Sequence, residues 1–273
     1  MVGTLSYAKS IGLRVSKSSD VAQSDLMLVG AETGVMPRFG EQMLLSQTNS
    51  QTALEVSGSK ISQRSEFIET SASEDENVEG NTIWYSFSIY VDPVTELPTL
   101  IADGPEANIS LFQFNQRDES GSSTSPAMQI EIDAYGNIVA EFGTAVGKRS
   151  YVLVEGGTEG TDAIGQWVDI VIGVEWATDD SGWMEFHVRE EGETEYTLEA
   201  MDTGQNTSTG QVYLKLGVYR SFLERDPDLQ ESVTLAYYDG LRRADTLAEA
   251  VLPPDEGPLA GTDFADTLLG GAQ

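Results

Sequence analysis

The sequence contains no cysteine and a single histidine among its 273 residues. Without cysteine there is no disulfide framework, although this absence does not by itself place the protein in the cytosol. No run of about 18 apolar residues is present, so no membrane-spanning helix is expected. The first residues do not combine a basic segment with an apolar stretch, and no signal peptide is predicted from them.

Basic residues are also scarce, with 15 Lys and Arg against 45 Asp and Glu and a formal net charge of -30. Such a field repels nucleic acid, so binding of nucleic acid through general surface charge is not expected. It also opposes a polyanionic substrate. However, Arg64, Arg117, Lys215 and Arg220 all fall in three short segments. Because salt screens charges beyond about 10 Å, a local basic site is compatible with an acidic chain.

Glycine is plentiful, with 27 residues, and many short segments alternate apolar and polar side chains. No long segment has the periodicity of an amphipathic helix. Short alternating strands separated by turn residues are typical of β-sandwiches, and the length suffices for one large domain. The sequence therefore predicts an all-β sandwich over residues 1–250, with residues 251–273 outside it.

The clearest alternation lies in residues 213–220, where aliphatic side chains take one face and two tyrosines, a lysine and a glycine take the other. A solvated strand and a ligand-binding strand both fit this segment. Residues 111–117 and 63–67 set amide and charged side chains opposite phenylalanine in the same way. Side by side, three such strands would line a polar, locally basic groove. Its side chains would be Arg64, Glu66, Gln113, Asn115, Arg117, Tyr213, Lys215 and Tyr219.

The three segments read QRSEF, FQFN and YLKLGVYR, and they resemble the signature blocks of polysaccharide lyases with a jelly-roll fold. In the alginate lyases the blocks read RSEL, QIH or QVH, and YFKAGxYxQ. The phrases TIWYSFSIYV, GQWVD and AYYDG extend the resemblance over residues 25–250. The first and third blocks end differently from the alginate pattern, so the chain is more similar to the group of glucuronan lyase and heparin lyase I. The resemblance implies a concanavalin-like jelly roll with a concave groove.

This resemblance also implies the chemistry, which is β-elimination on an acidic polysaccharide such as glucuronan or alginate. Arg64, Gln113 and Asn115 would neutralise the substrate carboxylate. Tyr219 would remove the proton next to that carboxylate and then protonate the departing glycosidic oxygen. The residues expected to hold substrate are Tyr213, Lys215, Arg117, Arg220 and Glu66. Of these, Glu66 is better suited to orienting Arg64 or Lys215 than to reacting.

One position departs from the alginate pattern, because Asn115 stands where those enzymes carry histidine. Asparagine can donate to a carboxylate but cannot take a proton near neutral pH. If the histidine only neutralises charge, Asn115 replaces it and Tyr219 can carry both proton transfers. If the histidine is the base, the protein is inactive or acts on another stereochemistry. The only histidine, His187, lies outside the three segments and is expected to be a surface residue.

Two functions other than a lyase are compatible with the sequence. A carbohydrate-binding module on the same sandwich, which has lost catalysis with the histidine, is the main alternative. A glycoside hydrolase needs two carboxylates facing a groove, and the three segments offer mainly Glu66. Asp239, in AYYDG, is the candidate metal ligand, and a structural aspartate before Gly240 is an equal alternative.

Residues 251–258 are rich in proline and acid and are predicted to be a linker. Residues 259–272 resemble the opening of a hemolysin-type calcium-binding repeat, in which glycine forms tight corners and aspartate binds calcium. One repeat cannot stack on itself, so the natural chain is expected to continue. Calcium in a structural role is the expected cofactor. Such repeats accompany one-step bacterial export, which implies a secreted or cell-surface protein, expected to be a monomer.

Overall fold

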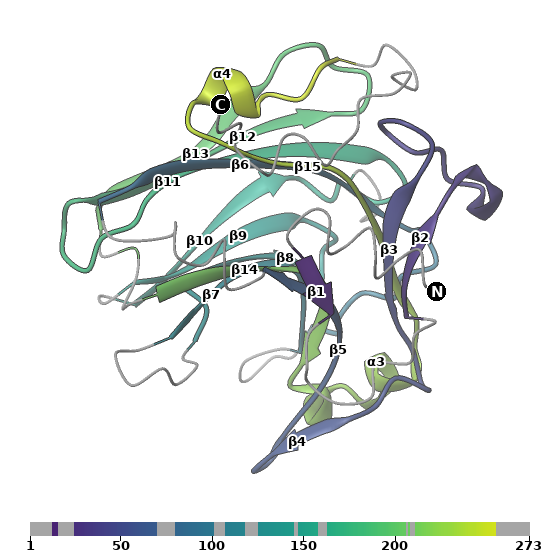
Figure 1. Cartoon of the computed structure of the whole chain (residues 1–273). Helices are drawn as coiled ribbons and strands as arrows, with labels where there is room; N and C mark the ends of the chain where they lie inside the picture. The colour runs from purple at the N-terminus through teal and green to yellow at the C-terminus, as the bar shows by residue number, and fades with distance from the viewer. Residues whose placement is uncertain are drawn as a thin grey trace.

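The computed structural model describes residues 13–15, 25–69, 80–100, 107–117, 125–144, 147–157, 163–205, 207 and 211–254. Within these ranges the chain forms two antiparallel sheets that pack face to face (Figure 1). The two packed sheets confirm the predicted all-β sandwich. The calcium-binding repeat predicted at residues 259–272 lies outside the described residues.

Sheet A has eight strands, in the order β1-β5-β14-β7-β8-β9-β10 with β4 also paired to β5. The strands are β1 (Leu13–Val15), β4 (Glu55–Ser57), β5 (Lys60–Glu69), β7 (Asn108–Arg117), β8 (Met128–Ile132), β9 (Ile138–Thr144), β10 (Gly147–Val154) and β14 (Gln211–Ser221). The three segments singled out in the sequence form β5, β14 and β7. These are neighbours in the sheet, so the prediction that they lie side by side is confirmed.

Sheet B has seven strands, in the order β13-β12-β11-β6-β15-β3-β2. The strands are β2 (Leu26–Val29), β3 (Met43–Thr48), β6 (Thr82–Val91), β11 (Trp167–Glu175), β12 (Gly182–Glu190), β13 (Thr197–Gln205) and β15 (Thr234–Ala244). The short helices are η1 (Ala31–Thr33), η2 (Leu223–Arg225), α3 (Pro227–Glu231) and α4 (Leu247–Ala250). Among the described residues, no helix is both long and apolar enough to cross a membrane.

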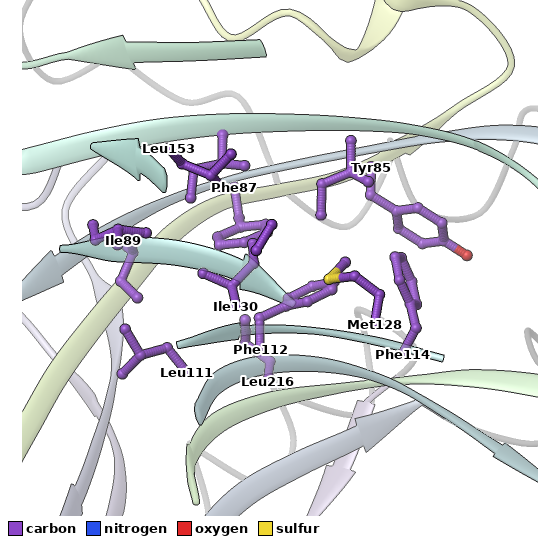
Figure 2. Close-up of a cluster of buried hydrophobic side chains, with 14 of the residues drawn as sticks. Tyr85, Phe87, Ile89, Leu111, Phe112, Phe114, Met128, Ile130, Leu153 and Leu216 are labelled. Carbon is purple, nitrogen blue, oxygen red and sulfur yellow. The ribbon is translucent and has the colours of Figure 1, made fainter. Parts of the chain in front are cut away.

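The core lies between the two sheets, where apolar side chains from alternate positions of each strand meet (Figure 2). Phe87 of β6 stacks on Phe112 of β7, with ring centroids 4.7 Å apart, and so joins sheet B to sheet A. Tyr85 meets Phe114 edge to face at 4.9 Å. Because these rings use the inner face of β7, the alternate residues of β7 are directed to the opposite face of sheet A.

A buried ion network fastens the loop before β3 and the C-terminal segment to sheet B. Asp169 of β11 accepts hydrogen bonds from Arg38 at 2.9 and 3.2 Å, from Nε of Arg189 at 2.9 Å, and from Ser88. Arg189 also donates to the carbonyl of Pro253 at 2.8 Å. The predicted linker therefore begins as a bound segment, in which Leu252 is fully buried.

We expect Asp169→Asn to lower the free energy of unfolding by about 3–5 kcal/mol, because it leaves two buried guanidinium groups without their carboxylate. Urea unfolding followed by tryptophan fluorescence measures the change. Asp245→Asn, at an exposed position, serves as the matched control and should cost less than about 0.5 kcal/mol. A loss below about 1 kcal/mol for Asp169→Asn would contradict this account of the network.

Candidate active site

The candidate residues gather on the face of sheet A that points away from sheet B. In the strand register Tyr219 lies opposite Arg64, Lys215 opposite Gln113, and Tyr213 opposite Asn115. We call these residues, together with Glu66 and Arg117, the polar face. The structure thus brings together eight of the nine residues predicted to catalyse or to bind substrate. The groove expected over this face stays a prediction.

A glycine bulge in β14 sets the position of the tyrosine. The pairing of β14 with β7 shifts register between Leu216 and Tyr219. Gly217 has φ of 133°, and a Cβ atom there would lie 2.2 Å from the carbonyl oxygen of Ser65. The glycine therefore accommodates a close approach by the backbone of β5. Only glycine allows this approach. The accompanying bulge sets Tyr219 opposite Ser110 of β7, while the continuous pairing of β14 with β5 sets it opposite Arg64.

Arg64 is held between two carboxylates and the tyrosine ring. Its guanidinium lies 2.7 Å from Glu55 and 3.2 Å from Glu66, and 4.6 Å from the ring centroid of Tyr219. Burial alone would lower the pKa of Arg64, but the two carboxylates outweigh it and the pKa lies above its ordinary value. Glu66 also contacts Nζ of Lys215 at 3.4 Å. It therefore orients both cations, as predicted.

Two amide side chains line the middle of the polar face. Gln113 is only 2% exposed, and its Nε2 finds no hydrogen-bond partner among the described residues. Asn115 accepts a hydrogen bond from the backbone N–H of Gln116 at 2.9 Å, so its oxygen is engaged. A buried donor without an acceptor is costly and calls for an explanation. A ligand carboxylate or hydroxyl that reaches Gln113 would supply the acceptor.

At the far end of the polar face Arg117 packs over the ring of Tyr213, 4.6 Å from its centroid. Tyr219, Arg64 and Arg117 are partly exposed, whereas Tyr213 and Lys215 are buried. A substrate can therefore meet the three exposed side chains first, and it must displace covering atoms to reach the amide of Gln113.

The comparisons with known proteins identify the family and the fold. Residues 31–242 match the family model described as polysaccharide lyase. The chain belongs to the polysaccharide lyase family. An endo-β-1,4-glucuronan lyase from the fungus Trichoderma reesei has the same β-jelly-roll fold, with a TM-score of 0.53 and 14% identity over 86% of this chain and 91% of that chain. The chain is thus a polysaccharide lyase with a jelly-roll fold, as the sequence predicted.

Solved structures with lower TM-scores include alginate lyase A1-II', which is 14% identical and has a TM-score of 0.45. The match covers 81% of the present chain and 93% of the A1-II' chain. An exolytic alginate lyase from Zobellia galactanivorans has 10% identity and a TM-score of 0.46 over 83% and 90% of the two chains. No curated protein matches the sequence.

Arg220 is the candidate that the structure does not place on the polar face. Its side chain is fully buried and donates to Gln63, to the carbonyl of Leu229 at 2.6 Å and to that of Ser232 at 3.1 Å. Burial lowers the pKa of Arg220 to about 10. The predicted contact with substrate does not fit this position. Instead, Arg220 ties the α3 segment of the lyase to β14 and β5.

Asp239 and His187 both belong to sheet B, away from the polar face. The Asp239 carboxylate accepts from the backbone N–H of Phe39 at 2.7 Å and of Gly240 at 2.8 Å, and burial raises its pKa to about 7. No group of three or more side chains suited to a metal ion occurs within the described ranges. Calcium binding by Asp239 stays a prediction. His187 pairs with Glu185 at 2.9 Å.

Sequence reasoning missed a carboxylate next to the polar face. Glu131 of β8 lies opposite Ser110 of β7, which lies opposite Tyr219. It accepts hydrogen bonds from Asn108 at 2.5 Å and Ser110 at 3.3 Å. Burial, reinforced by Glu141, raises the pKa of Glu131 to about 7. The alternation of residues 128–132 already placed Glu131 opposite the apolar face, but only the register shows that it neighbours Tyr219.

Glu131 makes the stability of the lyase depend on pH. Between about pH 4.5 and pH 7 the folded chain holds a proton on Glu131 that the unfolded chain has released, so raising the pH lowers the free energy of unfolding. The full effect is at most about 3 kcal/mol. Denaturant unfolding at pH 5 and pH 8 should show that Glu131→Gln loses less stability over this interval than the wild type. Identical losses in the two proteins would contradict the assignment.

Proposed function

We propose that the lyase cleaves a uronic-acid polymer, of the glucuronan or alginate type, by β-elimination at the polar face. The buried amide nitrogen of Gln113 carries this proposal, because it is a hydrogen-bond donor for which the described part of the chain supplies no acceptor. It lies opposite Lys215 of β14, the strand that also carries Tyr219, and Arg64 lies on β5, the next strand beyond. A carboxylate that reaches this amide is surrounded by the cations and the phenol that elimination needs.

Neutralising the carboxylate is the first requirement of the reaction. The C–H next to a charged carboxylate is a very weak acid, and removing its proton adds a second negative charge to the same group. The guanidinium of Arg64 and the amide N–H groups of Gln113 and Asn115 would hold the carboxylate and stabilise the enolate-like intermediate. The ion pairs of Arg64 with Glu55 and Glu66 hold its guanidinium in place for this contact.

Proton transfer is assigned to Tyr219. In its deprotonated form its oxygen takes the proton from the carbon beside the carboxylate. The bond between the neighbouring carbon and the glycosidic oxygen then breaks, and the same hydroxyl returns the proton to the departing oxygen. The fragment that keeps the glycosidic oxygen gains a new reducing end. The other fragment ends in a sugar with a carbon–carbon double bond conjugated to its carboxylate. One residue can perform both steps when proton and leaving group are on the same side of the sugar.

The assay for this proposal is the ultraviolet absorbance of that conjugated double bond. We expect a rise with one of polyglucuronate, polymannuronate, polyguluronate or heparin, and polyglucuronate is the first candidate because the glucuronan lyase shares the fold. Tyr219→Phe should lower the rate by at least about 100-fold while leaving polymer binding nearly intact. Tyr135→Phe, in an exposed turn, is the matched control and should leave the rate unchanged.

Silence on all four polymers with retained binding would instead support the carbohydrate-binding alternative. A rate that survives Tyr219→Phe would keep the lyase activity but remove Tyr219 from the proton transfers. Repeating the assay with and without calcium tests the expected structural cofactor at the same time.

The role of Asn115 is tested by changing its charge. If it neutralises the carboxylate through its N–H group, Asn115→Asp places a negative charge against that carboxylate and should lower kcat/KM by at least about 100-fold. Ser150→Asp puts the same charge on exposed β10 of sheet A and should change kcat/KM by less than about threefold. Equal losses in both variants would mean that general repulsion, not the position of Asn115, controls the rate.

A further inference from the structure

We propose that Lys60 and Phe222, flanked by Arg225, form a second uronate-binding position beside the reacting one. This inference rests on the proposed function and extends it to the neighbouring part of the polymer chain. Lys60 begins β5, and Phe222 follows β14 directly, so both lie where the strands carrying Arg64 and Tyr219 leave the sheet. None of the three residues belongs to the signature segments.

The three side chains are connected to the catalytic tyrosine by contacts between cations and rings. Nζ of Lys60 lies 4.4 Å from the ring centroid of Phe222 and 5.7 Å from that of Tyr219. The guanidinium of Arg225 lies 4.7 Å from the Phe222 ring. Lys60 therefore bridges the reacting tyrosine and the second aromatic ring. Cation–π contacts of this kind fix the position of a charge without neutralising it.

Charge supports an anionic ligand at this position. Acidic residues outnumber basic ones by 45 to 15 in the sequence, yet no carboxylate of the described residues forms an ion pair with Lys60. The Glu224 carboxylate lies near enough for its charge to interact with Lys60, but it is shared with Arg225 and leaves the position with a net positive charge. Arg225 has a loose contact with Glu224, at 3.7 Å, and is exposed. A uronate polymer carries a carboxylate on each acidic sugar, so the sugar next to the reacting one needs a cation of its own. Lys60 supplies it.

Phe222 supplies an apolar surface for the sugar ring. It is partly exposed, and it has φ of 59°, the one positive φ of a non-glycine residue in the described ranges. A bulky residue rarely adopts this conformation. Backbone outliers of this kind cluster at functional sites. The conformation of Phe222 therefore supports a binding role for its ring.

The opposite flank of the polar face is unsuited to a second uronate. At this flank Glu131 lies on β8 and Glu141 lies on β9. Lys148 pairs with Glu141 at 2.6 Å, and it is the only basic residue among those described that interacts with the two carboxyl groups. Lys148 is already paired with Glu141, and Glu131 brings no positive charge, so the described residues offer a substrate carboxylate no uncommitted cation at this flank. The asymmetry directs the neighbouring acidic sugar toward Lys60 and Phe222.

The test measures binding with catalysis blocked. Calorimetry with the Tyr219→Phe protein compares the di- and hexasaccharides of glucuronan and of alginate. Lys60→Gln should raise the Kd of the hexasaccharide about tenfold, the equivalent of one charge-assisted contact, and that of the disaccharide by less than about twofold. Phe222→Gly should do the same while relieving the backbone conformation, so that a folding defect cannot account for the loss.

Lys148→Gln is the matched control on the acidic flank and should leave both Kd values within about twofold of the starting protein. Tight hexasaccharide binding that neither Lys60→Gln nor Phe222→Gly weakens would overturn the second position while leaving the proposed function intact. The same holds if both variants weaken the disaccharide equally. If neither polymer's oligosaccharides bind at all, the proposed function fails and the second position fails with it.

Discussion

The close approach of β14 to β5 at Gly217 is the constraint on which the candidate site depends. The space left by the missing side chain lets the backbone of Ser65 and Glu66 come within contact distance, and the accompanying bulge shifts the register of β14. That shift sets Tyr219 opposite Ser110 of β7, while the uninterrupted register of β14 with β5 sets it opposite Arg64. The hydroxyl of Ser46, from sheet B, donates to the carbonyl of Ser65 and accepts from the N–H of Val218 at 2.9 Å, so it fixes the bulge from beneath. The geometry of the polar face is thus set by the backbone and by the second sheet.

Around Arg64 and Lys215 the charges of the polar face cancel in the free protein, and Arg117 adds one positive charge at its far end. Arg64 and Lys215 carry two positive charges, and Glu55 and Glu66 return two negative ones within 2.7 to 3.4 Å. A substrate carboxylate therefore meets no large net charge, but it meets donors held in fixed positions. Preorganised donors stabilise charge that develops in a reaction better than mobile ones, because no reorganisation is needed when the charge appears. The same grouping shows that a chain of net charge -30 can still hold cations together at one site.

Much of the site could be predicted because strands obey a period of two. Alternation identified β5, β7 and β14, and the resemblance of their sequences to the lyase blocks indicated that they are neighbours. The same alternation places Arg220 with Leu216 and Val218 on the core face, so its burial was already encoded in the sequence. The resemblance assigned it to substrate because it ends a signature block. Where pattern and resemblance disagreed, the pattern was right.

The residues that were missed are those that depend on contacts between distant segments. Lys60 lies four residues before Arg64 and so shares its face, but nothing local shows that its ammonium reaches the rings of Tyr219 and Phe222. Glu131 becomes a neighbour of the polar face only through the register of β7 with β8. Alternation within one strand shows which of its residues share a face. Only the order and register of the strands show which residues of different strands are neighbours. The candidate site could be read from the three strands, whereas its flanks required the fold.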